Sequence, residues 1–154
     1  MNKKGKYVYD WPMPMVTVDA VVFAASEGIV KLLLIKRKND PFKGKWAIPG
    51  GFIGIDEDLD HAVVRELFEE TGLTHIKLEQ MHTFGKPGRD PRGRQITVVY
   101  MGIIADGLNR INAGDDAADA RWFDINTLPP NMAFDHDDVT KFAIDRLKAK
   151  LSAP

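Results

Sequence analysis

The chain has 154 residues, of which 44% are hydrophobic and 28% charged, and its formal net charge at pH 7 is −1. These values are typical of one globular domain, and the near-zero charge provides no global field to attract nucleic acid or an anionic membrane. The absence of cysteine excludes disulfides, thiolate metal sites and cysteine nucleophiles. No apolar segment resembles a secretory signal or reaches membrane-spanning length, so we expect a cytoplasmic protein that binds neither nucleic acid nor membranes.

A polar and aromatic lead-in over residues 1–14 precedes one expected domain over residues 15–154. Within that domain, runs of β-branched and aliphatic residues bounded by glycine, proline and polar turns predict β-strands. In chain order these strands are 16–24, 30–37, 46–48, 75–84, 95–104 and 120–123. The first two flank a short turn at 26–28 and form an expected hairpin, whereas the third stops at the turn Pro49-Gly50-Gly51.

The first expected helix runs roughly over residues 58–71. Asp56 or Asp58 caps its first amides, and acidic side chains suit the positive end of the helix dipole. Gly72 suits the position after the helix because glycine tolerates a positive φ.

The first helix carries three carboxylates, Glu66, Glu69 and Glu70, within one arc of about 100°. They lie near the helix C-terminus, where the dipole is already negative, so each like-charge pair costs stability unless a cation binds. The arc nearly opposite consists of Val64, Leu67 and Phe68. We expect this apolar arc to pack on the sheet while the acidic arc faces outward.

A second helix is expected near the C-terminus, with Asp135 or Asp137 as its N-terminal cap. The candidates for its inner face are Val139, Phe142, Ala143, Leu147 and Leu151. Strands and helices that interleave in this way predict an α/β sandwich around one mixed sheet.

The segment that contains the first helix resembles the Nudix box at each of its defined positions. The matching residues are Gly51-x5-Glu57-x7-Arg65-Glu66-Leu67-x-Glu69-Glu70-x-Gly72-Leu73. The resemblance implies the Nudix α/β/α sandwich with a central mixed β-sheet, and a hydrolase that cleaves a nucleoside diphosphate linked to another moiety with Mg²⁺ or Mn²⁺. These hard ions prefer carboxylate and carbonyl oxygens and share themselves with substrate phosphates.

The resemblance also implies roles for individual residues. Glu66, Glu69 and Glu70 bind the metals, together with the carbonyl of Gly50, at the turn before the helix. Glu57 pairs with Arg65 and braces the loop against the helix, and in some members the equivalent of Glu57 also touches metal. The expected metal ligands are therefore Gly50, Glu57, Glu66, Glu69 and Glu70.

The general base is expected among the box glutamates, as Glu66 or Glu69, since one carboxylate must accept the proton of the attacking water. Arg65 stands beside them as a further catalytic residue. The later loop at 112–119 supplies Asp115 and Asp116, and an equivalent loop provides a ligand or base in several relatives. We expect Asp116 to support catalysis.

The loop at 85–94 resembles that of bacterial and archaeal ADP-ribose pyrophosphatases, with a Thr-Phe-Gly turn, a proline and an Arg-Asp-Pro-Arg-Gly-Arg run. Guanidinium groups fork onto phosphate oxygens, so such a loop can hold a diphosphate. The candidate substrate-binding residues are Arg37, Lys86, Arg89, Arg92 and Arg94. The favoured reaction is cleavage of ADP-ribose to AMP and ribose 5-phosphate.

Other interpretations stay open at this point. One is a hydrolase that removes altered nucleoside triphosphates, and another is a sensor that binds ADP-ribose without turnover. The cationic loop has a solvated surface loop as its alternative. The four histidines lack metal-ligand spacing and are taken as surface or core residues. A homodimer is expected from the resemblance alone.

Overall fold

The computed structural model describes residues 5, 7–104, 111, 113–114 and 117–154. Its elements follow the order of strands and helices that the sequence predicts, with one strand added. The strands are β1 (Met15–Ser26), β2 (Ile29–Arg37), β3 (Trp46–Ala47), β4 (Gly50–Phe52), β5 (Glu79–Phe84), β6 (Gln95–Ile104) and β7 (Ala117–Asp124). The helices are α1 (Leu59–Thr71) and α2 (His136–Ser152).

One mixed sheet contains all of these strands. Its main path is β3-β2-β1-β6-β5, with β4 paired to β1 and β7 paired to β2. The β1–β6 pair is parallel, and the other pairs are antiparallel. The expected mixed sheet is therefore confirmed, with β1 at its centre.

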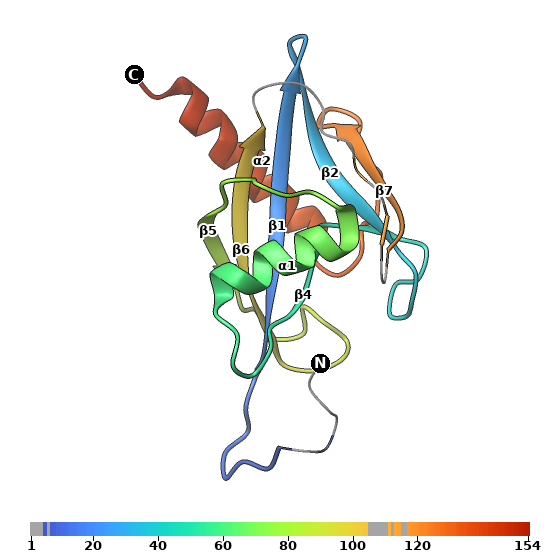
Figure 1. The fold of residues 1–154 in the computed structure, drawn as a ribbon, viewed down its shortest axis with the longest axis vertical. Coiled ribbons are helices and arrows are strands. Elements are labelled where there is room, and N and C mark those ends of the chain that lie inside the picture. The colour runs from blue at the N-terminus through green and yellow to red at the C-terminus, as the bar shows by residue number, and fades with distance from the viewer. Residues whose placement is uncertain (1–4, 6, 105–110, 112, 115–116) are drawn as a thin grey trace.

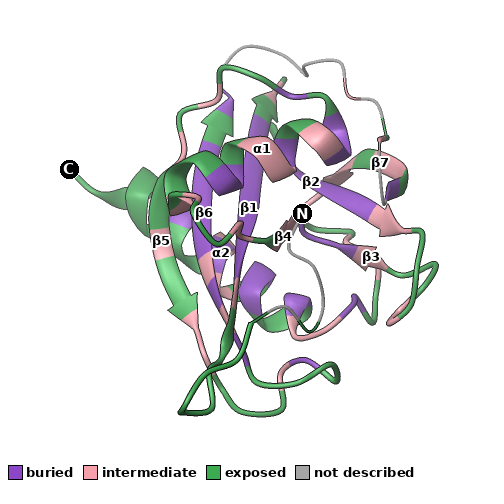
Figure 2. Ribbon diagram, turned by 60° about the horizontal axis from the view of Figure 1, so that its bottom comes forward, coloured by how far each residue is buried: buried purple, intermediate pink, exposed green. Residues whose placement is uncertain are grey.

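The two helices cover opposite faces of the sheet, α1 in front and α2 behind in Figure 1. Figure 2 shows that β1 and β6 are buried along much of their length. Their buried side chains alternate between two cores. The α1 side includes Val18, Ala20, Val22 and Tyr100, and the α2 side includes Val21, Phe23, Val99 and Met101. The arrangement is an α/β/α sandwich, and burial on both faces explains why β1 is an almost continuous apolar run.

The ends of α1 and the first hairpin follow the local signals in the sequence. Asp58 is the N-cap of α1, and its side chain accepts a hydrogen bond from the amide of Asp60 at 2.9 Å. Gly72 has φ of 75° and its N–H donates to the carbonyl of Phe68, as expected after a helix. Glu27 and Gly28 both have positive φ in the tight turn between β1 and β2.

The inner face of α1 differs from the expected one. Val64 and Phe68 are 48% and 53% exposed, whereas Ala62, Val63 and Leu67 pack against the sheet. The helix is rotated relative to the expectation, and the carboxylate of Glu70 comes to the buried side. The expectation that Val64, Leu67 and Phe68 form the inner face is wrong for Val64 and Phe68. Apolar residues lie on several sides of this helix, and the position of the sheet determines which of them are buried.

The inner face of α2 is shorter than expected. Val139, Ala143 and Leu147 are buried, but Phe142 is only partly buried and Leu151 is 71% exposed. Figure 1 shows the last turns of α2 extending beyond the sheet, so Leu151 has no layer to pack against. The expectation for Leu151 is wrong for this reason.

β1, β2 and β3 differ from their expected bounds by one or two residues at an end, and larger differences occur elsewhere. β4, which was not expected, begins within the expected turn at Pro49-Gly50-Gly51 and runs antiparallel to β1 with Gly50 opposite Asp19. β5 begins at Glu79, four residues later than the expected 75, and β7 extends to both sides of the expected 120–123. Short strands of this kind are specified by their partner more than by their own residues.

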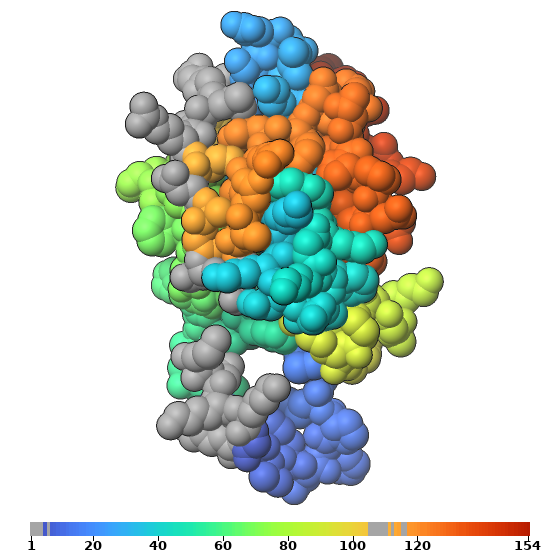
Figure 3. Space-filling model, turned by 90° about the vertical axis from the view of Figure 1, so that its right-hand side faces the viewer, coloured from blue at the N-terminus to red at the C-terminus, as the bar shows by residue number. Residues whose placement is uncertain are grey.

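Residues 7–14 project away from the body of the domain before β1 begins (Figures 1 and 3). Val8, Trp11 and Met13 in this segment are 93%, 80% and 60% exposed. In the part of the chain that the structure describes, neither helix has the length and apolar character required to cross a bilayer.

Candidate active site

The loop between β4 and α1 is tied to the helix by Glu57 and Arg65. Arg65 Nε donates to Glu57 Oε1 at 2.6 Å, and its Nη2 donates to Glu57 Oε2 at 2.8 Å. Nη2 also donates to the carbonyl of Phe52 at 3.1 Å, and Glu57 Oε2 accepts the amide of Gly54 at 2.8 Å. This bidentate pair confirms the expected brace between Glu57 and Arg65.

The same guanidinium gathers two further carboxylates of the acidic face. Arg65 Nη1 donates to Glu66 Oε1 at 2.8 Å and to Glu69 Oε2 at 3.1 Å. One cation therefore holds three glutamates from two segments. The hydrogen bonds to Glu57, and then those to Glu66, raise the pKa of Arg65 against the opposing effect of burial. A planar group with several fixed donors is needed for this geometry, so lysine is not equivalent at position 65.

Glu70 lies on the inner side of the acidic face and contacts the Gly50 strand. Its Oε2 accepts a hydrogen bond from the amide of Gly50 at 2.9 Å, and the residue is 7% exposed. Gly50 has no room for a side chain, because a Cβ atom there would overlap the carbonyl of Val18 and the carboxylate of Asp19. The close approach of β4 to β1 thus requires glycine at position 50.

The carboxylates of this cluster have strongly different environments. Hydrogen bonds from Arg65 hold the pKa of Glu57 down, at about 2, against the opposing effect of burial. Burial raises the pKa of Glu66, and it raises that of Glu70 to about 8, where nearby Glu66 and Asp19 add repulsion. Glu70 is therefore an acid whose charged form gains little from the protein itself.

The donor set fits a divalent cation by its chemistry. Buried or half-buried carboxylates meet at a glycine turn, where a Cβ on Gly51 would lie 2.6 Å from the carboxyl carbon of Glu66. Within the described residues no three His, Cys, Asp or Glu side chains are already arranged around one point as metal ligands. Arg65 draws Glu66 and Glu69 towards its own guanidinium, so ion binding there requires these side chains to turn. Oxygen donors, a backbone carbonyl and a buried carboxylate of raised pKa together suit Mg²⁺ or Mn²⁺.

The later loop reaches this end of α1. The amide of Gly114 donates to the carbonyl of Glu70 at 3.3 Å, and a Cβ on Gly114 would overlap the carbonyl of Glu69. The expected supporting residue Asp116, and Asp115 beside it, lie outside the described residues.

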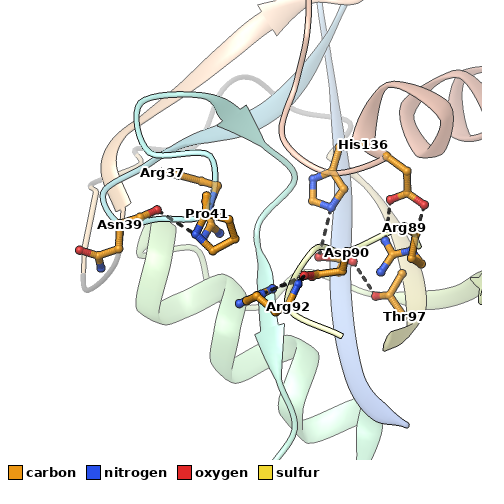
Figure 4. A network of polar contacts seen from close by, with 10 residues as sticks. Arg37, Asn39, Pro41, Arg89, Asp90, Arg92, Thr97 and His136 are labelled. Atoms are coloured by element: carbon orange, nitrogen blue, oxygen red, sulfur yellow. Dashed lines mark hydrogen bonds and ion pairs between the residues drawn. The ribbon is translucent and has the colours of Figure 1, made fainter. Parts of the chain in front are cut away.

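The arginines of the loop at 85–94 are placed differently from one another. Arg89 has a side chain that is 4% exposed, and it forms a bidentate pair with Asp135 at 2.9 and 2.6 Å. Arg92 pairs with Asp90, and its guanidinium carbon lies 5.0 Å from the ring centre of Phe52 in β4. Of these two candidate substrate contacts, Arg89 is thus committed to an ion pair with Asp135, whereas Arg92 lies beside the ring of Phe52 and pairs with Asp90 (Figure 4).

The remaining candidates for substrate contact are spread around the same end of the sheet. Arg37 donates from Nε to the carbonyl of Pro41 at 2.7 Å, and its charge acts to lower the pKa of Glu70. Its guanidinium carbon lies 4.9 Å from the ring centre of Phe134, and that of Arg92 lies 5.1 Å from the same ring. Lys86 and Arg94 lie on the exposed surface of the loop.

The sequence and the fold of the whole domain can now be compared with those of known proteins. Residues 13–142 match the family model of the NUDIX domain. The chain belongs to the Nudix family. The expectation drawn from the box residues is confirmed, and this Nudix chain is a pyrophosphohydrolase related to ADP-ribose pyrophosphatases.

Three of the proteins that are similar to this Nudix chain in sequence or structure indicate its subgroup. An ADP-ribose pyrophosphatase of Methanocaldococcus jannaschii is 45% identical over 128 residues, which are 83% of this chain and 72% of that protein. The NUDIX domain of Shewanella oneidensis NrtR, solved as a cocrystal with ADP ribose, has a TM-score of 0.81 and 34% identity, covering 90% of this chain and 94% of that one. An ADPR responsive transcriptional repressor NtrR of Acinetobacter baylyi is 36% identical over 92% of this chain, which spans 57% of the repressor.

A second group of buried polar residues comes from β1, β6 and the start of α2, and the sequence analysis assigned it no role. Asp19, Thr97 and His136 are 6%, 0% and 4% exposed. Thr97 Oγ1 donates to Asp19 Oδ2 at 2.5 Å, and His136 Nδ1 accepts the amide of Ile48 at 3.0 Å. The available signal was an aspartate in the middle of the apolar β1, since a buried charge needs partners.

Proposed function

We propose that this Nudix hydrolase cleaves the diphosphate of ADP-ribose and releases AMP and ribose 5-phosphate. The observation that carries the proposal is the 45% identity, over most of both chains, to a protein named ADP-ribose pyrophosphatase. The likeness to a NUDIX domain solved with ADP ribose supports the same substrate.

Glu66, Glu69 and Glu70, with the carbonyl of Gly50, would hold the divalent ions, as Mg²⁺ or Mn²⁺. When bound, such ions neutralise the diphosphate and lower the pKa of a bound water. Glu69 or Glu66 would accept the proton of the attacking water. Both carboxylates contact Arg65, and they would turn from it to hold an ion. Asp116 would support them from the later loop.

Glu57 acts through its position and not as a ligand in this proposal. Both of its oxygens are engaged by Arg65, and its lowered pKa keeps it charged at neutral pH. The brace fixes the loop after β4 against α1, which keeps the Gly50 turn beside the acidic face. This arrangement supports the structural role expected from the box.

Arg92 and Arg37 are the proposed contacts for the anionic substrate, since both lie at the end of the sheet that carries the glutamates. Lys86 and Arg94 are exposed and can add positive charge near the proposed substrate contacts. Arg89 contributes indirectly, because its guanidinium is committed to Asp135. We propose that Arg89 holds the loop so that Arg92 stays beside Phe52.

A substrate panel tests this proposal. ADP-ribose, NADH, a diadenosine polyphosphate and an oxidised purine nucleoside triphosphate are incubated with the protein and Mg²⁺ or Mn²⁺, and the products are identified by chromatography. We expect AMP and ribose 5-phosphate from ADP-ribose, with a higher kcat/KM than for the others. In Glu69→Gln, kcat should fall by at least about 100-fold, the low end for loss of acid–base or metal function.

A sensor without turnover is the second candidate, because the A. baylyi relative is a repressor that responds to ADPR. Binding of ADP-ribose in calorimetry together with no AMP release under any metal condition would favour the sensor. Preferred cleavage of the oxidised triphosphate would instead favour the sanitising hydrolase. The absence of a nucleic-acid partner, the homodimer and the cytoplasmic location stay predictions.

A further inference from the structure

A buried histidine holds the strand segment that leads into the acidic site. His136 is the first residue of α2, and its Nδ1 accepts a hydrogen bond from the amide of Ile48 at 3.0 Å. Ile48 lies between β3 and β4, and 88 residues separate the two partners in sequence. The contact therefore links the start of α2 to the turn that carries Gly50. Figure 4 shows the His136 ring beside the polar groups of β1 and of the loop at 85–94.

Three elements fix consecutive residues of this turn. α2 holds the amide of Ile48 through His136, β1 donates from the amide of Ala20 to the carbonyl of Pro49 at 2.8 Å, and α1 accepts the amide of Gly50 through Glu70 at 2.9 Å. Pro49 has no amide hydrogen of its own, so the bond to His136 is the last side-chain restraint before Gly50. Loss of that bond leaves a buried N–H group without a partner, which destabilises the turn in its present position.

The imidazole is in the form that this contact requires. An accepting Nδ1 carries a lone pair, so the ring is neutral with its proton on Nε2. Burial lowers the pKa of His136 and favours that neutral form, although the charge of Asp19 acts in the opposite direction. Nε2 faces Asp19 Oδ1 at 4.0 Å, and Thr97 donates to the other carboxylate oxygen of Asp19.

We propose that His136 is a positioning residue for the hydrolytic site, which acts through the Ile48 amide to set the place of Gly50. The proposal rests on the proposed role of the Gly50 carbonyl as a metal ligand beside Glu70. A shift of the turn would move this carbonyl and the Gly50 amide that donates a hydrogen bond to Glu70, while leaving the substrate loop in place. The effect should therefore fall on metal binding and kcat more than on KM.

Two amide substitutions separate positioning from simple burial of a polar residue. In His136→Asn the side-chain oxygen reaches about the place of Nδ1 and can accept from Ile48, whereas in His136→Gln the amide group lies about one bond further out, near the place of Nε2. Thr140→Val is the matched control, since Thr140 is 2% exposed one turn further along α2 and its Oγ1 has no hydrogen-bond partner among the described residues.

Calorimetric titration of each full-length variant with Mn²⁺ alone gives a readout that does not depend on turnover, and kinetics with ADP-ribose give kcat and KM. Supporting residues around metal sites contribute about 10–100-fold to affinity or activity. We expect His136→Gln to weaken Mn²⁺ binding and lower kcat by about tenfold or more, with KM within about twofold, and His136→Asn and Thr140→Val to stay within about threefold of wild type.

Equal Mn²⁺ affinity and equal kcat in the Asn and Gln variants would overturn the positioning role. A different result in the wild type, namely no Mn²⁺ uptake or no ADP-ribose cleavage, would instead overturn the proposed function on which it rests. If His136→Gln does not fold, hydrogen exchange of the wild-type Ile48 amide decides the contact. Protection equal to that of the core strands supports it, and fast exchange overturns it.

Discussion

At the scale of single residues, the carboxylates of the acidic site differ in how far they are buried and in how well neighbouring groups compensate their charge. Arg65 compensates Glu57, Glu66 and Glu69 in part, as the distances of 2.6 to 3.1 Å show. Glu70 is almost fully buried, and within the described part of the chain it accepts the amide of Gly50 and feels the charge of Arg37 without pairing with an arginine as the other three glutamates do. The residue with the least compensation is thus the one in closest contact with the glycine turn.

Glu70→Gln should stabilise the protein at high pH when a chelator removes divalent ions. The folded-state pKa of Glu70 is raised from 4.5 to about 8, so the charged form destabilises the fold and stability is lost as pH rises between these values. Glutamine keeps an oxygen that can accept from Gly50. The free energy of unfolding should rise by about 1–3 kcal/mol at pH 9 and change little at pH 4.5.

Thermal melts across this pH range measure the effect. Glu69→Gln is the control, because the Glu69 side chain is 37% exposed and its removal relieves less burial. A lower melting temperature for Glu70→Gln at pH 9 in chelator would mean that the charged carboxylate serves the fold and not an ion.

At the scale of elements, local signals predicted the boundaries and long-range contacts decided the orientation. The glycine at 72 and the turn at 26–28 are set by neighbours in sequence and were predicted correctly, and the structure selects Asp58 from the two expected caps, Asp56 and Asp58. The strand β4 was missed because its three residues are stabilised by β1, over 30 residues away. The same limit hid the contact between His136 and Ile48.

The Asp135 position illustrates this limit within one residue. A cap was expected there, and Asp135 does stand directly before α2, but its side chain makes no capping hydrogen bond. The carboxylate pairs with Arg89 instead, 46 positions earlier in the chain. Charge and position in sequence cannot distinguish these two partners, because both are consistent with an aspartate at the start of a helix.

The rotation of α1 can be tested by two adjacent alanine substitutions. Leu67 is 2% exposed and packs in the core, so Leu67→Ala should cost about 2–5 kcal/mol in the free energy of unfolding. Phe68 is 53% exposed, so Phe68→Ala should stay within about 0.5 kcal/mol of wild type. Urea denaturation measures both, and similar losses for the two variants would contradict the observed orientation.

At the scale of the whole molecule, the site forms where segments from distant parts of the chain meet at one end of the sheet. The glutamates come from α1, Gly50 from β4, Arg92 from the loop after β5 and His136 from α2. Figure 3 shows the loop at 85–94 beside the segment that precedes β3 on this side of the body. The start of α2 contacts both, through Asp135 to the loop and through His136 to the strand segment. This end of the helix therefore connects the substrate loop to the acidic site.

Arg89→Leu should release the loop at 85–94 because it removes one partner of a largely buried ion pair. The Arg89 and Asp135 side chains are 4% and 19% exposed, and breaking a buried pair by removing one partner can cost about 3–5 kcal/mol, whereas removing both is often much less costly. Hydrogen exchange of loop amides should become faster in Arg89→Leu, and urea melts of the double variant Arg89→Leu/Asp135→Leu should recover part of the lost stability. The expected coupling energy in that cycle is about 1–3 kcal/mol.

Arg92→Leu is the control, since the Arg92 side chain is 35% exposed and pairs with Asp90 within the same loop. Additive losses at positions 89 and 135 would show that the pair does not join the loop to α2.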